Sequence, residues 1–182
     1  GNGNTIVEQN EVFECDRGIG LCSESYKLQT KDCIVRDNFV YNNFRTGIYM
    51  GAYLGFDGLS TKNCYVVNNT LFNNNLKGGQ LDGTNNYLKV NDRDNSSEGE
   101  IRLSELCEEN VIANNIIYAV SDRDIFIRKY TTSGKNNYIG GNIYFSPTKK
   151  NHKWMWDGKE YTDFSAWQAV SGDKTSVFDV DP

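Results

Sequence analysis

Basic residues recur at one offset along the chain and could bind an acidic ligand. Each stands shortly before a short apolar run: Arg17, Arg45, Lys77 and Arg123. If the runs stack, these like charges lie side by side and repel one another, so anionic groups must lie among them. Nearby carboxylates such as Asp16 could neutralise the row as ion pairs. Alternatively, the row binds the carboxylates of a ligand, which guanidinium groups hold in bidentate geometry.

The apolar runs that follow these bases carry a second set of candidate residues. Strand alternation directs Ile19, Ile48 and Ile127 toward the interior. Their neighbours then face outward, where they could contact a ligand. We therefore predict a substrate-binding surface formed by Arg17, Arg45, Tyr49, Gln80 and Phe126.

Two aspartates in the same region, Asp82 and Asp124, could form a catalytic pair. If the two residues lie on adjacent repeats, offset by two positions along the strand, their Cα atoms are about 8 Å from each other. Inverting glycosidases place their two carboxyl groups about 6.5 to 9.5 Å apart. The pair therefore predicts glycoside hydrolysis as one interpretation of the site.

Composition excludes several other classes of protein. The 182 residues, 38% of them hydrophobic, suit one domain and contain no apolar run long enough to cross a bilayer. The net charge of -5 argues against general nucleic-acid binding, which needs a dominant basic surface. A single histidine, His152, leaves no Cys/His zinc cluster. The 5 cysteines, an odd number, favour buried free thiols over a disulfide framework.

An internal repeat defines the elements that must position these residues. Its anchor is an asparagine that recurs 27 to 31 residues apart, with one longer interval of 46, at Asn10, Asn38, Asn69, Asn115 and Asn142. An aliphatic residue stands three positions before each asparagine and an aromatic residue three positions after it. A third short apolar run follows about nine residues later, around Ile19-Leu21, Ile48-Met50, Leu81 and Ile125-Ile127. Three short strands per repeat predict an all-β parallel β-helix of about five coils, with the asparagines as an internal ladder.

The repeated N-x-hydrophobic-aromatic pattern, over residues 5–145, resembles the right-handed parallel β-helix superfamily typified by pectate lyases. The resemblance implies a right-handed helix that processes an extended, uronate-containing polysaccharide. That fold also supports glycosidases and non-catalytic, carbohydrate-binding surface modules, which stay open as alternatives. The same resemblance implies a secreted, periplasmic or cell-surface protein.

The lyases of this superfamily imply roles for individual residues. They use lysine or arginine as the base, which points to Lys77, Arg123 and Arg128 as bases or as groups that neutralise the substrate carboxylate. They often require Ca²⁺ held by acidic residues, for which Asp82 and Asp124 are the candidates.

The repeat pattern also predicts how the chain is divided. We expect coils over residues 1–148, an insertion at 84–110 and a C-terminal cap at 149–182, where a hairpin precedes a short helix. Trp154, Trp156, Phe164 and Trp167 would form a lid over the end of the stack, or else a sugar-stacking platform. Because Thr5 already lies inside a coil, we expect the chain to be the C-terminal part of a longer protein.

Overall fold

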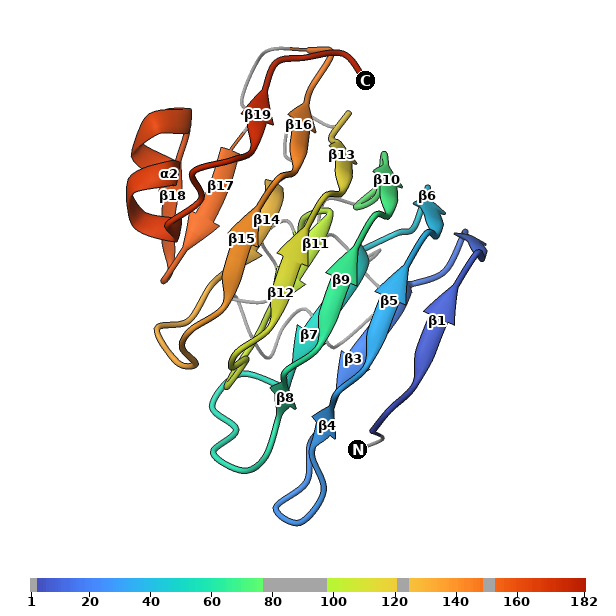
Figure 1. Ribbon diagram of the computed structural model, residues 1–182, viewed down its shortest axis with the longest axis vertical. Coiled ribbons are helices and arrows are strands. Elements are labelled where there is room, and N and C mark those ends of the chain that lie inside the picture. The colour runs from blue at the N-terminus through green and yellow to red at the C-terminus, as the bar shows by residue number, and fades with distance from the viewer. Residues whose placement is uncertain (1–2, 77–97, 121–124, 149–152) are drawn as a thin grey trace, which may run out of the picture.

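The computed structural model describes residues 3–76, 98–120, 125–148 and 153–182, and these form a stack of short parallel strands (Figure 1). The first sheet contains β1 (Ile6–Glu8), β5 (Ile34–Arg36), β9 (Tyr65–Val67), β12 (Val111–Ala113) and β15 (Tyr138–Gly140). The second sheet contains β2 (Glu11–Phe13), β6 (Phe39–Tyr41), β10 (Thr70–Phe72), β13 (Ile116–Tyr118), β16 (Ile143–Phe145) and β19 (Val177–Phe178).

The third sheet completes each coil. It contains β3 (Arg17–Cys22), β7 (Thr46–Gly51), β11 (Ile101–Leu103), β14 (Ile125–Lys129), β17 (Lys153–Trp156) and β18 (Lys159–Tyr161). A small pair, β4 (Thr30–Lys31) and β8 (Thr61–Lys62), lies in the turn between the third and first sheets. The predicted parallel β-helix of about five coils is confirmed, and its right-handedness stays a prediction.

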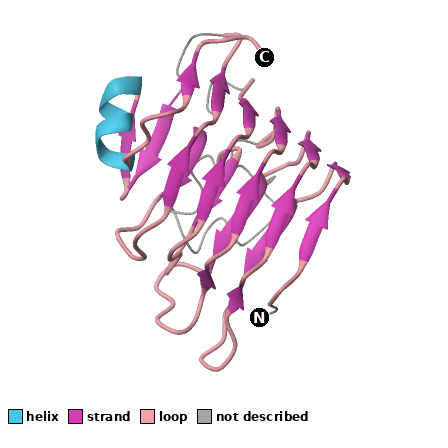
Figure 2. Ribbon diagram, in the orientation of Figure 1, coloured by secondary structure: helices cyan, strands magenta, loops and turns pink. Residues whose placement is uncertain are grey.

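The C-terminal segment closes one end of the stack, where Figure 2 shows the helix beside the last strands. Strands β17 and β18 form an antiparallel hairpin, and helix α2 (Phe164–Ser171) follows it. The Asp163 carboxylate accepts from the Ala166 amide at 2.7 Å and so caps the helix, which ends at Gly172 in the left-handed region.

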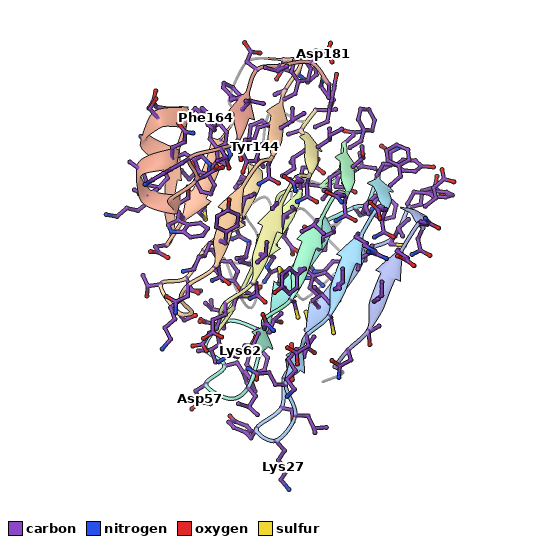
Figure 3. The ribbon with its side chains drawn as sticks, viewed as in Figure 1. Lys27, Asp57, Lys62, Tyr144, Phe164 and Asp181 are labelled. Carbon is purple, nitrogen blue, oxygen red and sulfur yellow. The ribbon has the colours of Figure 1, made fainter. Side chains whose placement is uncertain are left out.

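Aromatic side chains make this cap a lid over the core. Trp154 and Trp167 are fully buried, with ring centroids 5.9 Å apart. Phe164 on the helix packs on Tyr144 of β16 at 6.1 Å (Figure 3). Because both tryptophan rings are inaccessible to a ligand, the structure favours the lid over the sugar-stacking platform at this end. None of the described helices is long and apolar enough to span a membrane.

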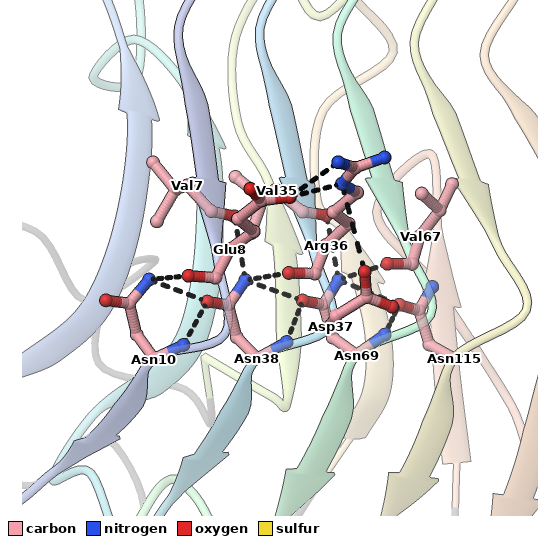
Figure 4. Close-up of polar contacts among 10 residues, drawn as sticks. All are labelled: Val7, Glu8, Asn10, Val35, Arg36, Asp37, Asn38, Val67, Asn69 and Asn115. Carbon is pink, nitrogen blue, oxygen red and sulfur yellow. Dashed lines mark hydrogen bonds and ion pairs between the residues drawn. The ribbon is translucent and has the colours of Figure 1, made fainter.

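The repeated asparagines form the predicted ladder (Figure 4). The backbone N–H and side-chain amide of Asn38 both donate to Oδ1 of Asn69, at 3.1 and 2.9 Å. The same paired bonds join Asn10 to Asn38, Asn69 to Asn115 and Asn115 to Asn142. An amide is needed at each step because it must donate to one coil and accept from another.

Two further ladders run parallel to the first. Asn43 donates to Asn74, and Asn74 donates to the buried carboxylate of Glu100, which replaces an asparagine in that row. In the other ladder, Asn110 donates to Asn137. The aromatic row predicted beside the first ladder is also present, for example between Phe13 and Tyr41 at 5.1 Å.

The third sheet differs from the expected alignment at two places. Its middle strand is β11, which lies within the segment expected to be an insertion, whereas the expected strand at Leu81 lies outside the described residues. In β14, both Phe126 and Ile127 belong to the core. Strict alternation does not allow this, and the pairing of β14 with β17 shifts register between Ile125 and Arg128.

Candidate functional site

A hollow of about 380 Å³ lies at the third sheet, over β3, β7 and β11. We call it the arginine groove. The residues that line it include Arg17, Cys22, Glu24, Tyr49, Tyr53 and Arg102. It is open to solvent and bordered by charged and aromatic side chains, as a site for a polar, ring-containing ligand requires.

Strand register sets the row at the base of the groove. Tyr49 pairs with Gly20 on one neighbouring strand and with Arg102 on the other. A Cβ atom at position 20 would lie 2.5 Å from the Tyr49 ring, so only glycine leaves room for that ring against β3. The Arg17 guanidinium lies 5.5 Å from the centroid of the same ring.

One buried carboxylate, Glu98, holds three arginines at this site. Arg17 binds it with two nitrogens, Nε at 3.0 Å and Nη2 at 3.1 Å. Arg102 Nη1 lies 2.9 Å from Glu98 Oε2, and Arg45 Nη2 pairs with Oε1. Asp16 adds weaker contacts to Arg17 at 3.5 Å and to Arg45 at 3.8 Å. Among the described residues of this cluster, three guanidinium groups thus gather around Glu98 and Asp16.

The charges of this cluster fix its protonation states. Burial alone raises the pKa of the Glu98 carboxyl, but Arg102, Arg17 and Arg45 outweigh it and lower that pKa to about 2. Burial lowers the pKa of Arg17, yet the Glu98 carboxylate raises it above its ordinary value. Glu98 is therefore ionised and Arg17 is charged at neutral pH.

Other groups in the groove are poorly suited to act as a base. Burial raises the pKa of the Cys22 thiol to about 12 and raises the pKa of the Tyr49 hydroxyl. Both groups are therefore protonated at neutral pH. The arginines can bind and orient an anion, whereas neither Cys22 nor Tyr49 is a ready proton acceptor at this pH.

The predicted binding residues differ in their accessibility. The side chain of Arg17 is 24% exposed, whereas that of Arg45 is only 3% exposed beneath it. Tyr49 is half-buried in the groove. Phe126 was expected to face outward, but it is buried among Tyr144 and Trp154 in the core because of the irregular register of β14. It cannot contact a substrate in this structure.

Arg128, predicted as a base or a neutralising group, lies next to the cluster but is buried. It pairs in register with Arg102, and the two guanidinium carbons lie 4.5 and 5.0 Å from the centroid of the Tyr130 ring. Arg102 Nη2 also donates to the Tyr130 hydroxyl at 3.0 Å. The tyrosine ring thus holds two neighbouring cations against the sheet.

The remaining predicted residues lie outside the described part of the chain: Lys77, Gln80, Asp82, Arg123 and Asp124. The calcium site, the aspartate pair and two of the candidate bases therefore stay predictions. Within residues 3–76, 98–120, 125–148 and 153–182, no three His, Cys, Asp or Glu side chains gather as metal ligands.

Glu98, Arg102 and Tyr130 were not identified from the sequence. A signal for Arg102 existed, since Ile101-Arg102-Leu103 repeats the pattern of Ile48-Tyr49-Met50. It was obscured because this strand lies within the longest interval between ladder asparagines, from Asn69 to Asn115. No local pattern marked Glu98, whose role depends on contacts across 81 residues of sequence.

Comparison with known proteins relates the chain to a longer bacterial protein. The chain is 30% identical over 175 residues, 94% of its length, to the uncharacterized protein YwoF of Bacillus subtilis (strain 168). It spans about a third of the length of this relative, 33%. No family model and no solved structure matches it. The function must therefore be argued from the site itself.

Proposed function

We propose that this chain binds an extended, uronate-containing polysaccharide along its third sheet and takes part in its cleavage by β-elimination. The parallel β-helix fits carbohydrate-processing proteins in general. The observation that carries the finer proposal is the cationic cluster of Arg17, Arg45 and Arg102 around Glu98, which opens into the arginine groove. A sugar carboxylate is an anion of suitable size for guanidinium groups.

The three arginines would have different roles in this binding. Arg17 and Arg102 line the groove and would contact the carboxylate of the bound sugar. Arg45 lies beneath them and would supply charge without touching the ligand. Glu98 neutralises part of the charge and fixes the direction of each guanidinium, so that the site is ordered before the ligand arrives.

The cationic groove suits the demands of β-elimination. In this reaction a base removes the proton on C5 of the uronate, the C4–C5 double bond forms, and the bond from C4 to the glycosidic oxygen breaks. The leaving oxygen takes up a proton. Negative charge builds up on the carboxylate side of the ring as the proton leaves, and Arg17 and Arg102 would stabilise it. Lys77 and Arg123 remain our candidates for the base, and Asp82 and Asp124 for binding Ca²⁺.

A non-catalytic carbohydrate-binding module is the second candidate. The observation that favours it is the state of three described groove residues, since Cys22 and Tyr49 stay protonated and Arg17 stays charged at neutral pH. Neither the Cys22 thiol nor the Tyr49 hydroxyl is then a ready proton acceptor, which suits a site that binds an anion without cleaving it. In either case the substrate is a cell-wall or matrix polysaccharide, so we propose a secreted, periplasmic or cell-surface location.

The proposal is tested by incubating the protein with polygalacturonate, alginate and hyaluronan, with Ca²⁺ and with a chelator. β-Elimination gives unsaturated products, which absorb in the ultraviolet, and we expect this absorbance to rise with one of the three. New reducing ends without absorbance would show hydrolysis and move attention to Asp82 and Asp124. Binding without either product would support the binding module. Absence of both binding and products with all three polymers would contradict the proposal.

A further inference from the structure

Two exposed tyrosines stand beside the arginine groove on the loops that follow β3 and β7. Tyr26 is 69% exposed and Tyr53 is 50% exposed. Both rings pack on Phe56, with centroid distances of 5.2 and 5.0 Å, and Phe56 itself is buried. We call these three residues the aromatic platform.

The platform is held in place by the coils around it. The two loops are joined where the Leu59 amide donates to the Ser25 carbonyl at 2.9 Å. Glu105, in the next coil, accepts from the Gly55 amide at 3.1 Å and from Ser60 through its backbone carbonyl at 2.8 Å. Figure 1 shows both loops projecting beyond the ends of the strands at the lower edge of the molecule. Exposed tyrosines in so well-bonded a position are arranged for contact with something outside the chain.

The platform is continuous with the groove, because Tyr53 lines the same hollow as Arg17 and Arg102. Polar groups border its aromatic faces. The Asp57 carboxylate accepts from the Tyr26 hydroxyl at 2.8 Å, and Glu24 lines the same hollow as Tyr53. Lys27 and Asp57 are at the tips of the two loops (Figure 3). This mixture of flat apolar faces and hydrogen-bonding rims matches a pyranose ring, which presents C–H groups on one face and hydroxyls around its edge.

We infer that Tyr26 and Tyr53 form a second sugar-binding subsite, which stacks a pyranose ring of the polysaccharide whose carboxylate is held by Arg17 and Arg102. The inference rests on the proposed function. Glu24 lines the same hollow as Tyr53, and Asp57 accepts from the Tyr26 hydroxyl, so both carboxylates border the subsite and can accept hydrogen bonds from sugar hydroxyls. Their negative charges repel a carboxylate, so the acidic group of the chain is directed toward the arginines. The two subsites together would bind longer oligosaccharides more tightly than short ones.

The test compares the affinities of tri- and hexagalacturonate by calorimetry for wild-type protein, Tyr26→Ala and Tyr53→Ala. We expect each substitution to weaken binding of the hexasaccharide by about tenfold. Tyr26 is not among the residues that line the groove, so Tyr26→Ala should leave binding of the trisaccharide, held by the arginines, nearly unchanged. Tyr53→Phe keeps the ring and should keep most of the affinity. The matched control is Tyr138→Ala, which removes a tyrosine of equal exposure, 51%, from the first sheet and should change neither affinity.

The outcomes separate this inference from the proposal beneath it. Unchanged hexasaccharide binding in both alanine variants would overturn the subsite while leaving the groove intact. An equal loss of hexasaccharide affinity in the Tyr138→Ala control would overturn the subsite as well. Failure of the wild-type protein to bind tri- and hexasaccharides of polygalacturonate, alginate and hyaluronan would overturn both the subsite and the proposed function. Sedimentation of wild-type protein as a dimer that Tyr53→Ala dissociates would show that a second copy, and not a sugar, occupies the platform.

Discussion

Glu98 is the residue on which the charged site depends. Its carboxylate is fully buried and is held by Arg17, Arg45 and Arg102, so that removal of its charge leaves three guanidinium groups facing one another. Breaking a buried ion-pair network from one side costs about 3 to 5 kcal/mol. At neutral pH we therefore expect Glu98→Gln to lower the free energy of unfolding by that amount in urea titrations.

The matched control for this substitution is Glu8→Gln. Glu8 also binds an arginine, Arg36, but both side chains are exposed by about 40%. Exposed pairs contribute about 0 to 1 kcal/mol, so this variant should be nearly as stable as the wild type. Equal effects of the two substitutions would show that the cluster does not stabilise the fold.

Glu98 also predicts how stability depends on pH. Its pKa in the folded protein is lowered from 4.5 to about 2, so its contribution is fully present above the ordinary pKa. As the pH falls from about 4.5 toward about 2, roughly 3 kcal/mol of stability should be lost from this group. Glu98→Gln should lack this part of the loss, which urea unfolding at several acidic pH values would measure. An identical acid profile for both proteins would contradict the account.

Arg17 and Arg45 both pair with Glu98, but their substitutions should have different effects. Arg17 lines the groove, whereas Arg45 is buried beneath it. We expect Arg17→Gln to weaken the binding of a uronate oligosaccharide by about tenfold with a loss of stability near 1 kcal/mol. Arg45→Gln should instead cost about 3 kcal/mol of stability. Calorimetric binding and thermal unfolding of both variants test this, and the reverse order of effects would contradict it.

At the scale of single residues, the sequence indicated which side chains face outward where one strand supplied them, while their binding roles stay predictions. It gave no signal for contacts between distant residues. Arg17 and Tyr49 lie in the groove as expected from their repeats. Phe126 did not follow the alternation, because register shifts in β14 bring it into the core. The role of Glu98 was identified only from the structure, because the fold brings its carboxylate to Arg17 and Arg45.

Among the elements, the asparagine ladder couples successive coils, and a substitution at its centre should lower the stability of the fold. Asn69 accepts two hydrogen bonds from Asn38 and donates to the Val35 carbonyl and to Asn115. Asn69→Ala would leave several of these buried groups unpaired, at about 1 to 3 kcal/mol each. We expect a loss of at least about 3 kcal/mol in urea unfolding.

The exposed end of the same ladder provides the control. Asn10 donates to Glu8 and Asn38 but lies in contact with water, which can replace its hydrogen bonds. Asn10→Ala should therefore cost about 1 kcal/mol or less. If the two alanine variants were equally stable, the ladder would not be a source of cohesion between coils.

The C-terminal cap is the second element with a testable role. Trp167 projects from α2 onto Trp154 and is fully buried. Trp167→Ala should cost about 3 to 5 kcal/mol and expose the end of the core to a hydrophobic dye. Val170→Ala on the same helix, at a position 42% exposed, should change stability by less than about 0.5 kcal/mol. A stable, dye-free Trp167→Ala variant would show that the lid is dispensable.

At the scale of the whole molecule, the repeat made the fold predictable. Asparagine, aliphatic and aromatic residues return at equal spacing because every coil makes the same turn, and the structure pairs them in register. The coil with the longest interval was aligned less well, since β11 lies far from its expected position at Leu81. The chemistry was harder to predict than the fold, because a shared scaffold does not specify which outward residues act.

Binding of a carboxylated sugar in the arginine groove is tested most directly by side-chain NMR. Titration with hexasaccharides of polygalacturonate, alginate and hyaluronan, followed through the arginine Nε–Hε signals, reports which guanidinium groups contact the ligand. We predict that the signals of Arg17 and Arg102 shift, while that of Arg36, an exposed arginine on the first sheet, stays unchanged. A shift confined to Arg36, or no shift at any of the three, would contradict the account.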